Sequence, residues 1–330
     1  MKKNYKIFII IMLFSLTAFT SYVPVLAEEN NSSFYIDGNI LYDVNDQPFI
    51  MRGVNYPHTW FKNQLEIAIP AIAATGANTV RIVLSDGSQW SRDLAPSVKR
   101  VLDICEKHKL ITVLEVHDAT GKNDLAALNK AVNYWISIKE VLFGKEDRVI
   151  INIANEWYGN WSGEEWAGAY KEAIGSLREA GFKHTIMVDS AGWGQYPTSI
   201  HQYGVSILES DPLRNIIFSI HFYEYSGKNS FTIRQNIDNV LNKGLALCVG
   251  EFGWKHTDGD VDEDYILEYT EKKAVGWLAW SWKGNGGGVE YLDLAEDWAG
   301  KEFTPWGERI VYGENGLKET SELASIFLNE

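Results

Sequence analysis

Short apolar runs rich in β-branched residues alternate along the chain with longer segments of helical periodicity. The helical segments include residues 64–76, 96–109 and 164–181, and several close on glycine, a common helix stop. Eight such strand–helix units, at a spacing of about 30 residues, predict a single α/β domain built as a (β/α)8 TIM barrel. A doubly wound sheet is the alternative, but no glycine-rich dinucleotide loop follows the first run. The expected strands are residues 49–56, 78–85, 110–118, 148–156, 185–192, 215–223, 245–253 and 275–284.

The two ends of the chain carry other patterns. Residues 34–49 alternate around Asp-Gly and Asn-Asp turns and predict a small N-terminal β-hairpin. Residues 320–330 predict a closing helix. Residues 1–27 combine three lysines, an apolar run of about a dozen residues and a small-residue "VLA" ending, which is typical of a secretory signal peptide. We therefore expect a secreted, extracellular protein whose catalytic domain spans residues 28–330.

Charge and cysteine content narrow the class of partner. Removing Lys2, Lys3 and Lys6 with the signal peptide reduces 30 basic residues to 27 against 44 acidic ones, a formal charge of −17. That balance repels nucleic acid and anionic membranes, whereas a neutral polysaccharide is indifferent to it. The two cysteines, Cys105 and Cys248, are expected to be buried free thiols rather than a disulfide. We expect a monomer without a nucleic-acid or membrane partner.

Polar and aromatic residues stand at the carboxyl ends of nearly all expected strands. In a barrel of this kind those ends surround the active-site mouth. Packing alone does not require polar residues at so many strand ends, so the pattern predicts a functional site there. The residues concerned are Asn55, Tyr56, Ser85, Asp86, His117, Asp118, Asn155, Glu156, His221, Tyr223, Glu251, Trp280 and Trp282.

Side-chain alternation selects two glutamates among them. In the fourth strand, Ile151 and Ile153 share one face, while Asn152, Ala154 and Glu156 share the inward face.

In the seventh strand, Val249 and Glu251 are expected on one face and Cys248 on the other. Two carboxylates, Glu156 and Glu251, then converge from opposed sides of the ring. Such a pair performs glycoside hydrolysis when one carboxyl is protonated and the other ionised.

Several separate stretches resemble glycoside hydrolase family 5, a family of clan A. They are "NTVRIVLSDG", "EVHDATG", "NIANEWYGNW", "HFYEY", "VGEFGW" and "GWLAWSWKGNGGG", spread over essentially the whole mature chain. The last of these, together with "VGEFGWKHTDGD", resembles the bacterial endo-β-1,4-mannanases of the family more than its cellulases.

The resemblance implies a retaining double displacement with Glu251 as nucleophile and Glu156 as general acid/base. It further implies that Asn155 binds the 2-hydroxyl of the sugar in subsite −1, and that Arg81 and Tyr223 hold Glu251. The remaining implied contacts to that sugar come from His117, His221 and Trp280.

Each of these candidate site residues also has a purely structural interpretation. A lone inward glutamate can be an ion-pair partner, and Arg81 can neutralise the inward Glu115 instead of, or as well as, Glu251. His117 and His221 are possible metal ligands, but no further ligand motif supports a catalytic metal. Tryptophans near the strand-to-helix loops can stack on sugars or pack the loops, and among them we choose Trp60 and Trp193 as substrate-binding candidates.

Two loops offer weaker motifs. Residues 256–264 carry Asp258, Asp260, Asp262 and Glu263, for which a solvated acidic loop is favoured over a structural calcium site. The glycine-rich residues 284–288 lack a Lys-Ser/Thr continuation and are read as a rim loop.

The resulting prediction is a secreted endo-β-1,4-mannanase that acts on mannan, galactomannan and glucomannan and requires no cofactor. An endoglucanase of the same family and a non-catalytic polysaccharide-binding protein are the alternatives.

Overall fold

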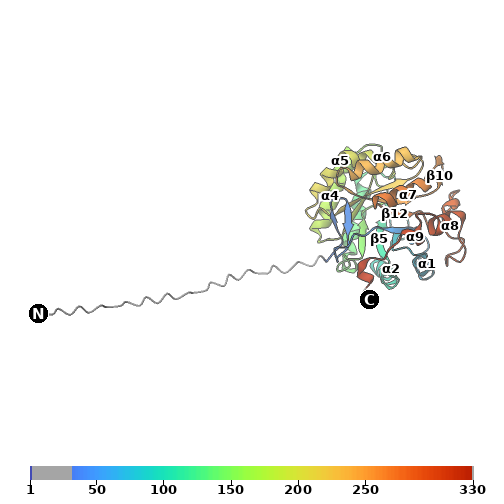
Figure 1. The fold of residues 1–330 in the computed structure, drawn as a ribbon, viewed down its shortest axis with the longest axis horizontal. Coiled ribbons are helices and arrows are strands. Elements are labelled where there is room, and N and C mark those ends of the chain that lie inside the picture. Colours follow the sequence, from blue (N-terminus) through green and yellow to red (C-terminus); the bar gives the residue numbers. More distant parts are fainter. Residues whose placement is uncertain (2–31, 329–330) are drawn as a thin grey trace. The chain divides into compact units, whose positions relative to one another are not determined.

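The computed structural model describes Met1 and residues 32–328, so the expected signal peptide, residues 1–27, lies outside the described residues. Eight parallel strands close into a barrel, which confirms the predicted (β/α)8 fold (Figure 1). Going round the ring from the first strand, they are β3 Arg52–Tyr56, β4 Thr79–Leu84, β5 Ile111–Val116, β6 Val149–Asn152, β7 Ile186–Asp189, β8 Ile216–Phe222, β9 Ala246–Phe252 and β12 Gly276–Ala279, which pairs with β3.

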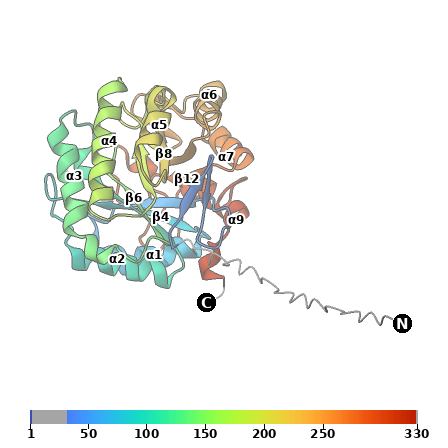
Figure 2. The same cartoon turned by 90° about the vertical axis from the view of Figure 1, so that its left-hand side faces the viewer.

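Helices surround this barrel, and most of the strands lie inside their ring in Figure 2. The outward side chains of the strands pack on the apolar faces of these helices in one large buried cluster, as parallel strands covered on their outer face require. The helices are α1 Leu65–Ala74, α2 Ala95–Lys107, α3 Leu125–Ser137, α4 Glu164–Glu179, α5 Thr198–Ser210, α6 Ser230–Leu241, α7 Glu263–Lys273, α8 Pro305–Tyr312 and α9 Leu317–Thr320.

The predicted N-terminal hairpin is present as β1 Tyr35–Asp37 and β2 Ile40–Tyr42, paired antiparallel. Its flanking residues Phe34 and Phe49 are buried in a second apolar cluster together with inward residues of the barrel strands such as Ile150 and Met187. The hairpin region therefore closes the end of the barrel opposite the carboxyl ends of the strands.

Two of the strands differ from the alternation that the sequence predicts. Strand β6 ends at Asn152, so regular alternation does not extend to Ala154 and Glu156. In β9 the pairing with β8 skips a residue: Val249 pairs with Ile220, and Glu251 pairs with His221, which leaves Gly250 as a bulge.

The bulge overturns part of the prediction for the seventh strand. Val249 packs outward among the helices, and Cys248 lies in the inner cluster with Met187 and Leu278. The prediction that Val249 and Glu251 share a face was wrong, because the extra residue reverses the alternation between them.

Two smaller predictions concern the C-terminal end and the thiols. The prediction of a closing helix over 320–330 is wrong: apart from Thr320, the last residue of α9, the described part of this segment contains only the short 3-10 turn Ser325–Phe327. Cys105 and Cys248 are both buried and free, as predicted. Within the described range, no helix has the length and apolarity needed to cross a membrane.

Candidate active site

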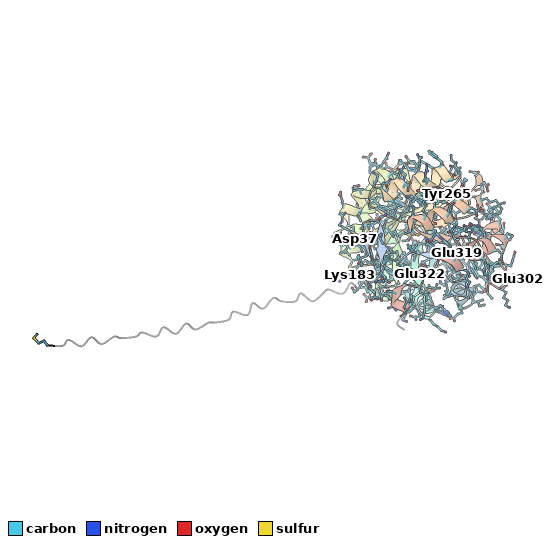
Figure 3. All side chains as sticks on the ribbon, viewed as in Figure 1. Asp37, Lys183, Tyr265, Glu302, Glu319 and Glu322 are labelled. Carbon is cyan, nitrogen blue, oxygen red and sulfur yellow. The ribbon has the colours of Figure 1, made fainter. Side chains whose placement is uncertain are left out.

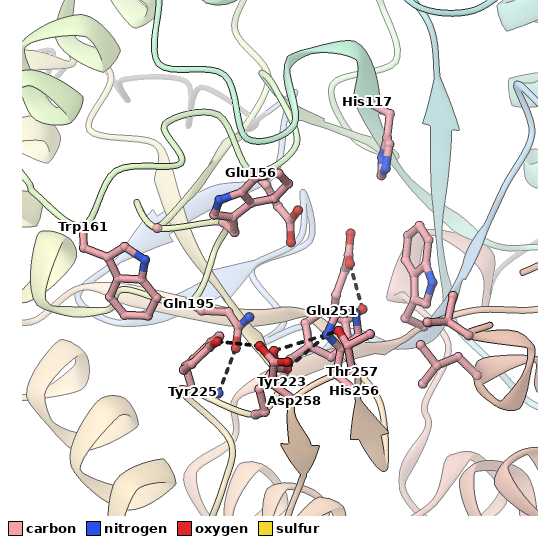
Figure 4. Close-up of a pocket in the computed structure, with 16 residues that line it drawn as sticks. His117, Glu156, Trp161, Gln195, Tyr223, Tyr225, Glu251, His256, Thr257 and Asp258 are labelled. Atoms are coloured by element: carbon pink, nitrogen blue, oxygen red, sulfur yellow. Dashed lines mark hydrogen bonds and ion pairs between the residues drawn. The ribbon is translucent and has the colours of Figure 1, made fainter. Parts of the chain in front are cut away.

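A cleft of about 670 Å³ opens at the carboxyl ends of the barrel strands (Figure 4). Six of the predicted site residues line it: His117, Glu156, Trp193, Tyr223, Glu251 and Trp280. Its full lining is His117, Glu156, Trp161, Gly192, Trp193, Gln195, Tyr223, Glu224, Tyr225, Glu251, His256, Thr257, Asp258, Trp280, Val289 and Leu292.

Glu156 and Glu251 face each other across this cleft. An oxygen of each carboxylate lies within 4.8 Å of the other and of a nitrogen of His221. Glu156 follows the end of β6 in a left-handed backbone conformation with φ of 45°, and its amide donates to Asp189 Oδ2 at 2.9 Å. A bulky residue adopts this conformation only where its surroundings impose it, so Asp189 helps fix the direction of the Glu156 side chain.

Both oxygens of Glu251 accept hydrogen bonds from predicted partners. Arg81 Nη1 donates to Oε1 at 2.8 Å, and the Tyr223 hydroxyl donates to Oε2 at 2.9 Å. Burial, followed by the neighbouring carboxylates of Glu251 and Glu156, raises the pKa of Tyr223 well above its usual value. Tyr223 therefore remains a neutral donor to Glu251 over the whole ordinary pH range.

Arg81 is fully buried beneath the cleft and carries the centre of a polar network. Its Nε and Nη2 donate to Asn152 Oδ1, and Nη2 also donates to Asn155 Oδ1 at 2.6 Å. Glu115 lies 4.0 Å from Nη1, so the structural reading of Arg81 coexists with its bond to Glu251. Burial lowers the pKa of Arg81, but Glu115, Glu251 and Asp189 outweigh burial and raise it, so the guanidinium is always charged.

His221 lies between the two glutamates. Its Nδ1 is 2.7 Å from Glu156 Oε1 and 3.7 Å from Glu251 Oε2, and its Nε2 is 3.6 Å from Asp189 Oδ2. Burial lowers the pKa of His221, but the carboxylates of Glu251 and Asp189 more than offset burial and raise it to about 10. The ring thus provides positive charge between three carboxylates.

His117 and Trp280 form the opposite wall of the cleft. Their rings stack with centroids 5.8 Å apart, and His117 Nδ1 lies 2.9 Å from Glu115 Oε1. Trp60 is not among the residues that line this cleft; its ring meets His117 edge-on at 5.2 Å, and its contact with substrate stays a prediction.

Asn155 is buried, and both ends of its amide are engaged: Nδ2 donates to Thr120 Oγ1 at 2.9 Å, and Oδ1 accepts from Arg81. One Nδ2 hydrogen is left for a ligand. Its contact with a sugar hydroxyl stays a prediction.

Sequence reasoning missed several residues of the site. Asp189 and Asn152 form the buried layer beneath it, and both were visible as polar residues in apolar strands. Glu224, Tyr225 and Gln195 line the cleft from loops, where no periodicity marks a residue for a site. Glu224 and Tyr225 lie within the stretch "HFYEY", which carries part of the family resemblance and was the available signal.

The expectations of no catalytic metal, and of a solvated acidic loop rather than a calcium site, remain predictions. Among the described residues, a single group of three metal-type side chains lies close enough to share an ion, and it consists of Glu156, His221 and Glu251. In the acidic loop, Asp258 accepts from the Tyr225 hydroxyl and Asp262 caps α7 through the amide of Tyr265, so these carboxylates have other partners.

Comparison with known proteins agrees with this geometry. The family model described as cellulase, glycosyl hydrolase family 5, matches residues 42–286. The chain therefore belongs to glycosyl hydrolase family 5 and is a glycoside hydrolase.

Several curated proteins and solved structures that are similar to this chain are β-mannanases. The mannan endo-1,4-beta-mannosidase of Salipaludibacillus agaradhaerens is 57% identical over 299 residues, which cover 91% of this chain and 97% of that protein. The enzyme of the same name from Streptomyces lividans is 41% identical over 305 residues, covering 91% and 79%. Among solved structures, the β-mannanase of Thermomonospora fusca has a TM-score of 0.86 at 44% identity, covering 89% of this chain and 99% of that one.

Proposed function

We propose that this protein is a secreted, retaining endo-β-1,4-mannanase in which Glu251 is the nucleophile and Glu156 the general acid/base. The observation that carries the proposal is the pair of carboxylates with oxygens within 4.8 Å of each other at the mouth of the barrel. Retaining glycosidases place their carboxyl groups about 5–5.5 Å apart, whereas inverting enzymes leave room for a water between them.

The two steps use the groups already described. An oxygen of Glu251 bonds to the anomeric carbon while the glycosidic C–O bond breaks and Glu156 gives its proton to the leaving oxygen. Glu156 then takes a proton from water, whose oxygen bonds to the anomeric carbon and releases Glu251. Arg81 and Tyr223 aim Glu251. We propose that Asn155, His117, His221 and Trp280 hold the sugar at the reacting centre and that Trp60 and Trp193 are further contacts to the substrate.

Replacing Glu251 by alanine tests the nucleophile. We expect Glu251→Ala to lose turnover of mannan yet regain it in azide, because azide attacks the anomeric carbon from the vacated side and yields an α-mannosyl azide. Glu156→Ala, by comparison, should lose about 10²–10⁴-fold in turnover because general acid catalysis is absent. Full activity of Glu251→Ala would refute the assignment and point to another nucleophile, whereas a wild type that binds mannan without turning it over would be a sugar-binding protein.

Substrate choice is proposed from the relatives. Mannan endo-1,4-beta-mannosidases match nearly the whole chain, although one relative, 44% identical over 274 residues, is named beta-mannanase/endoglucanase A. We therefore expect hydrolysis of soluble galactomannan, glucomannan and linear mannan. Measuring galactomannan beside carboxymethylcellulose decides between the two activities, since activity on the cellulose derivative alone would make the protein an endoglucanase.

Secretion and cofactor use are separate proposals. The N-terminal segment supports export with cleavage after Ala27. N-terminal sequencing of protein from the culture medium should then begin at Glu28. Because two carboxylates supply both the nucleophile and the proton, we propose that no cofactor is required and that dialysis against EDTA leaves turnover intact. A loss of turnover that calcium restores would instead support an ion in the acidic loop.

A further inference from the structure

Three aromatic rings project into the cleft with about half of their surface exposed. Trp161 is 50% exposed, and Trp193 and Tyr225 are each 49% exposed. Trp161 is held edge-on against Tyr225, with ring centroids 5.5 Å apart, and against Tyr196 at 5.4 Å. The rings are therefore fixed in place but uncovered, which is the arrangement that stacking on a sugar needs.

The backbone at Trp193 is shaped to present its ring. Gly192, Trp193 and Gly194 all have positive φ, of 62°, 59° and 70°, although a tryptophan rarely adopts this conformation. The indole lies on Gly121, where an added Cβ would be only 2.2 Å from it, and on Gly159, where the distance would be 2.9 Å. Strain of this kind persists where the surroundings over-determine it, often at binding sites.

A buried carboxylate faces the same part of the cleft. Glu224 is only 9% exposed but lines the cleft. His256 Nδ1 lies 3.3 Å from its Oε1 and 3.1 Å from its Oε2 and holds the carboxylate in place. A carboxylate with one such partner keeps free lone pairs, and a sugar hydroxyl in the cleft is a donor for them.

The two glutamates define which sugar would lie here. In Figure 4, Trp161, Gln195 and Tyr225 lie on one side of Glu156 and Glu251, and His117 lies on the other. A general acid protonates the leaving oxygen, so the sugar that departs must lie on the side of Glu156 away from the sugar being attacked.

We propose that Trp193, Trp161 and Tyr225 form the subsite for the leaving-group sugar, and that Glu224 accepts a hydrogen bond from one of its hydroxyls. The ligand class is a β-linked hexopyranoside chain extending toward its reducing end. The inference rests on the proposed function for the direction of the chain.

The bond cut in mannohexaose tests this direction. With H₂¹⁸O marking the new reducing end, mass spectrometry of early products locates each cut. In Trp193→Ala and Glu224→Gln we expect the cuts to move toward the reducing end and kcat/KM to fall by about tenfold or more, because binding then relies on the opposite side of the cleft. Trp193→Phe should retain more activity than Trp193→Ala, since it keeps a ring. Phe231→Ala, on exposed α6, is the matched control and should keep the wild-type pattern.

Other results overturn the proposal. A shift of the cuts toward the non-reducing end would place Trp193 on the other side, and an unchanged pattern would remove it from substrate binding. An aryl β-mannobioside, whose leaving group is not a sugar, checks for general damage: kcat/KM should fall much less for it than for mannohexaose, and an equal fall contradicts a subsite role. If wild type cuts cellohexaose but not mannohexaose, the proposed function fails while the same mapping on cellohexaose still tests the subsite.

Discussion

His221 contacts both reacting carboxylates, and its charge couples the site to stability. Its pKa is about 10 in the folded protein against an ordinary 6.5, so the protonated ring stabilises the fold fully below pH 6.5. That contribution is lost progressively as the pH rises from 6.5 toward 10. We therefore expect the difference in Tm between wild type and His221→Ala to be largest near pH 6 and to shrink toward pH 10, as measured by calorimetry.

His184 offers the matched control. It is also buried, but burial lowers its pKa to about 4, so its contribution grows between pH 4 and 6.5 and is constant above that range. His184→Ala should therefore lower Tm by the same amount at pH 7 and pH 10. A Tm difference for His221→Ala that is equally constant would contradict a charged His221.

The functional residues at strand ends could be predicted from the sequence, because a carboxylate directly after an apolar strand has few structural roles. Glu156, Glu251 and Tyr223 all reach the cleft. The layer beneath was harder to predict. Asn152 hydrogen-bonds with Arg81 of β4 and Asp189 of β7, and Asp189 also accepts from the amide of Glu156 and approaches Arg81. These contacts depend on the register between strands, which the pattern within one strand does not encode.

At the scale of the element, the bulge in β9 decides where the nucleophile points. An added Cβ at Gly250 would lie 2.3 Å from Ser219 Oγ and 3.1 Å from His221 Nε2. We expect Gly250→Ala to lower the free energy of unfolding by about 1–3 kcal/mol through overpacking, and to reduce kcat because His221 and Glu251 are displaced. Denaturant unfolding and galactomannan turnover measure the two effects.

Gly175 is the control for this substitution. It lies inside α4, where an added Cβ meets no atom within 4 Å. Gly175→Ala should raise the free energy of unfolding by up to about 1 kcal/mol from helix propensity, with turnover unchanged. If Gly250→Ala behaves in the same way, the bulge is not sterically fixed by glycine.

The bulge also explains why the predicted alternation placed Glu251 correctly at the cleft but assigned Val249 to the wrong face of the strand. An isolated glycine inside a strand pattern is a signal for a bulge, and Gly250 was that signal. The early end of β6 had no comparable mark, because the apolar run continues through Ile153 and Ala154. Strand number and order were recoverable because each strand is a separate apolar run, whereas irregularities that aim side chains arise from tertiary contacts.

The N-terminal hairpin region lies at the end of the barrel away from the cleft, so a substitution there should change stability without changing catalysis. Phe34 is buried there with no exposed surface. Phe34→Ala should lower the free energy of unfolding by about 3–5 kcal/mol, with kcat on galactomannan unchanged at temperatures where the variant is folded. A matching loss of kcat would mean that the two ends of the barrel are coupled. Phe231→Ala, at an exposed ring, should change neither quantity.

For the whole molecule, the excess of acidic residues leads to a prediction about salt. The chain has 44 acidic against 30 basic residues, and carboxylates such as those of Asp37, Glu302 and Glu319 are exposed on the surface of the barrel domain (Figure 3). Salt screens such charges over a distance of about 10 Å at 0.1 M, so it changes the rate of encounter with a charged substrate but not with a neutral one.

We expect kcat/KM on neutral galactomannan to change by less than about twofold between 20 and 500 mM NaCl. Any residual activity on anionic carboxymethylcellulose should instead rise with salt, because screening reduces its repulsion from the acidic surface. A strong fall of galactomannan hydrolysis with salt would show that charged contacts, rather than aromatic stacking and hydrogen bonds to hydroxyls, dominate binding in the cleft.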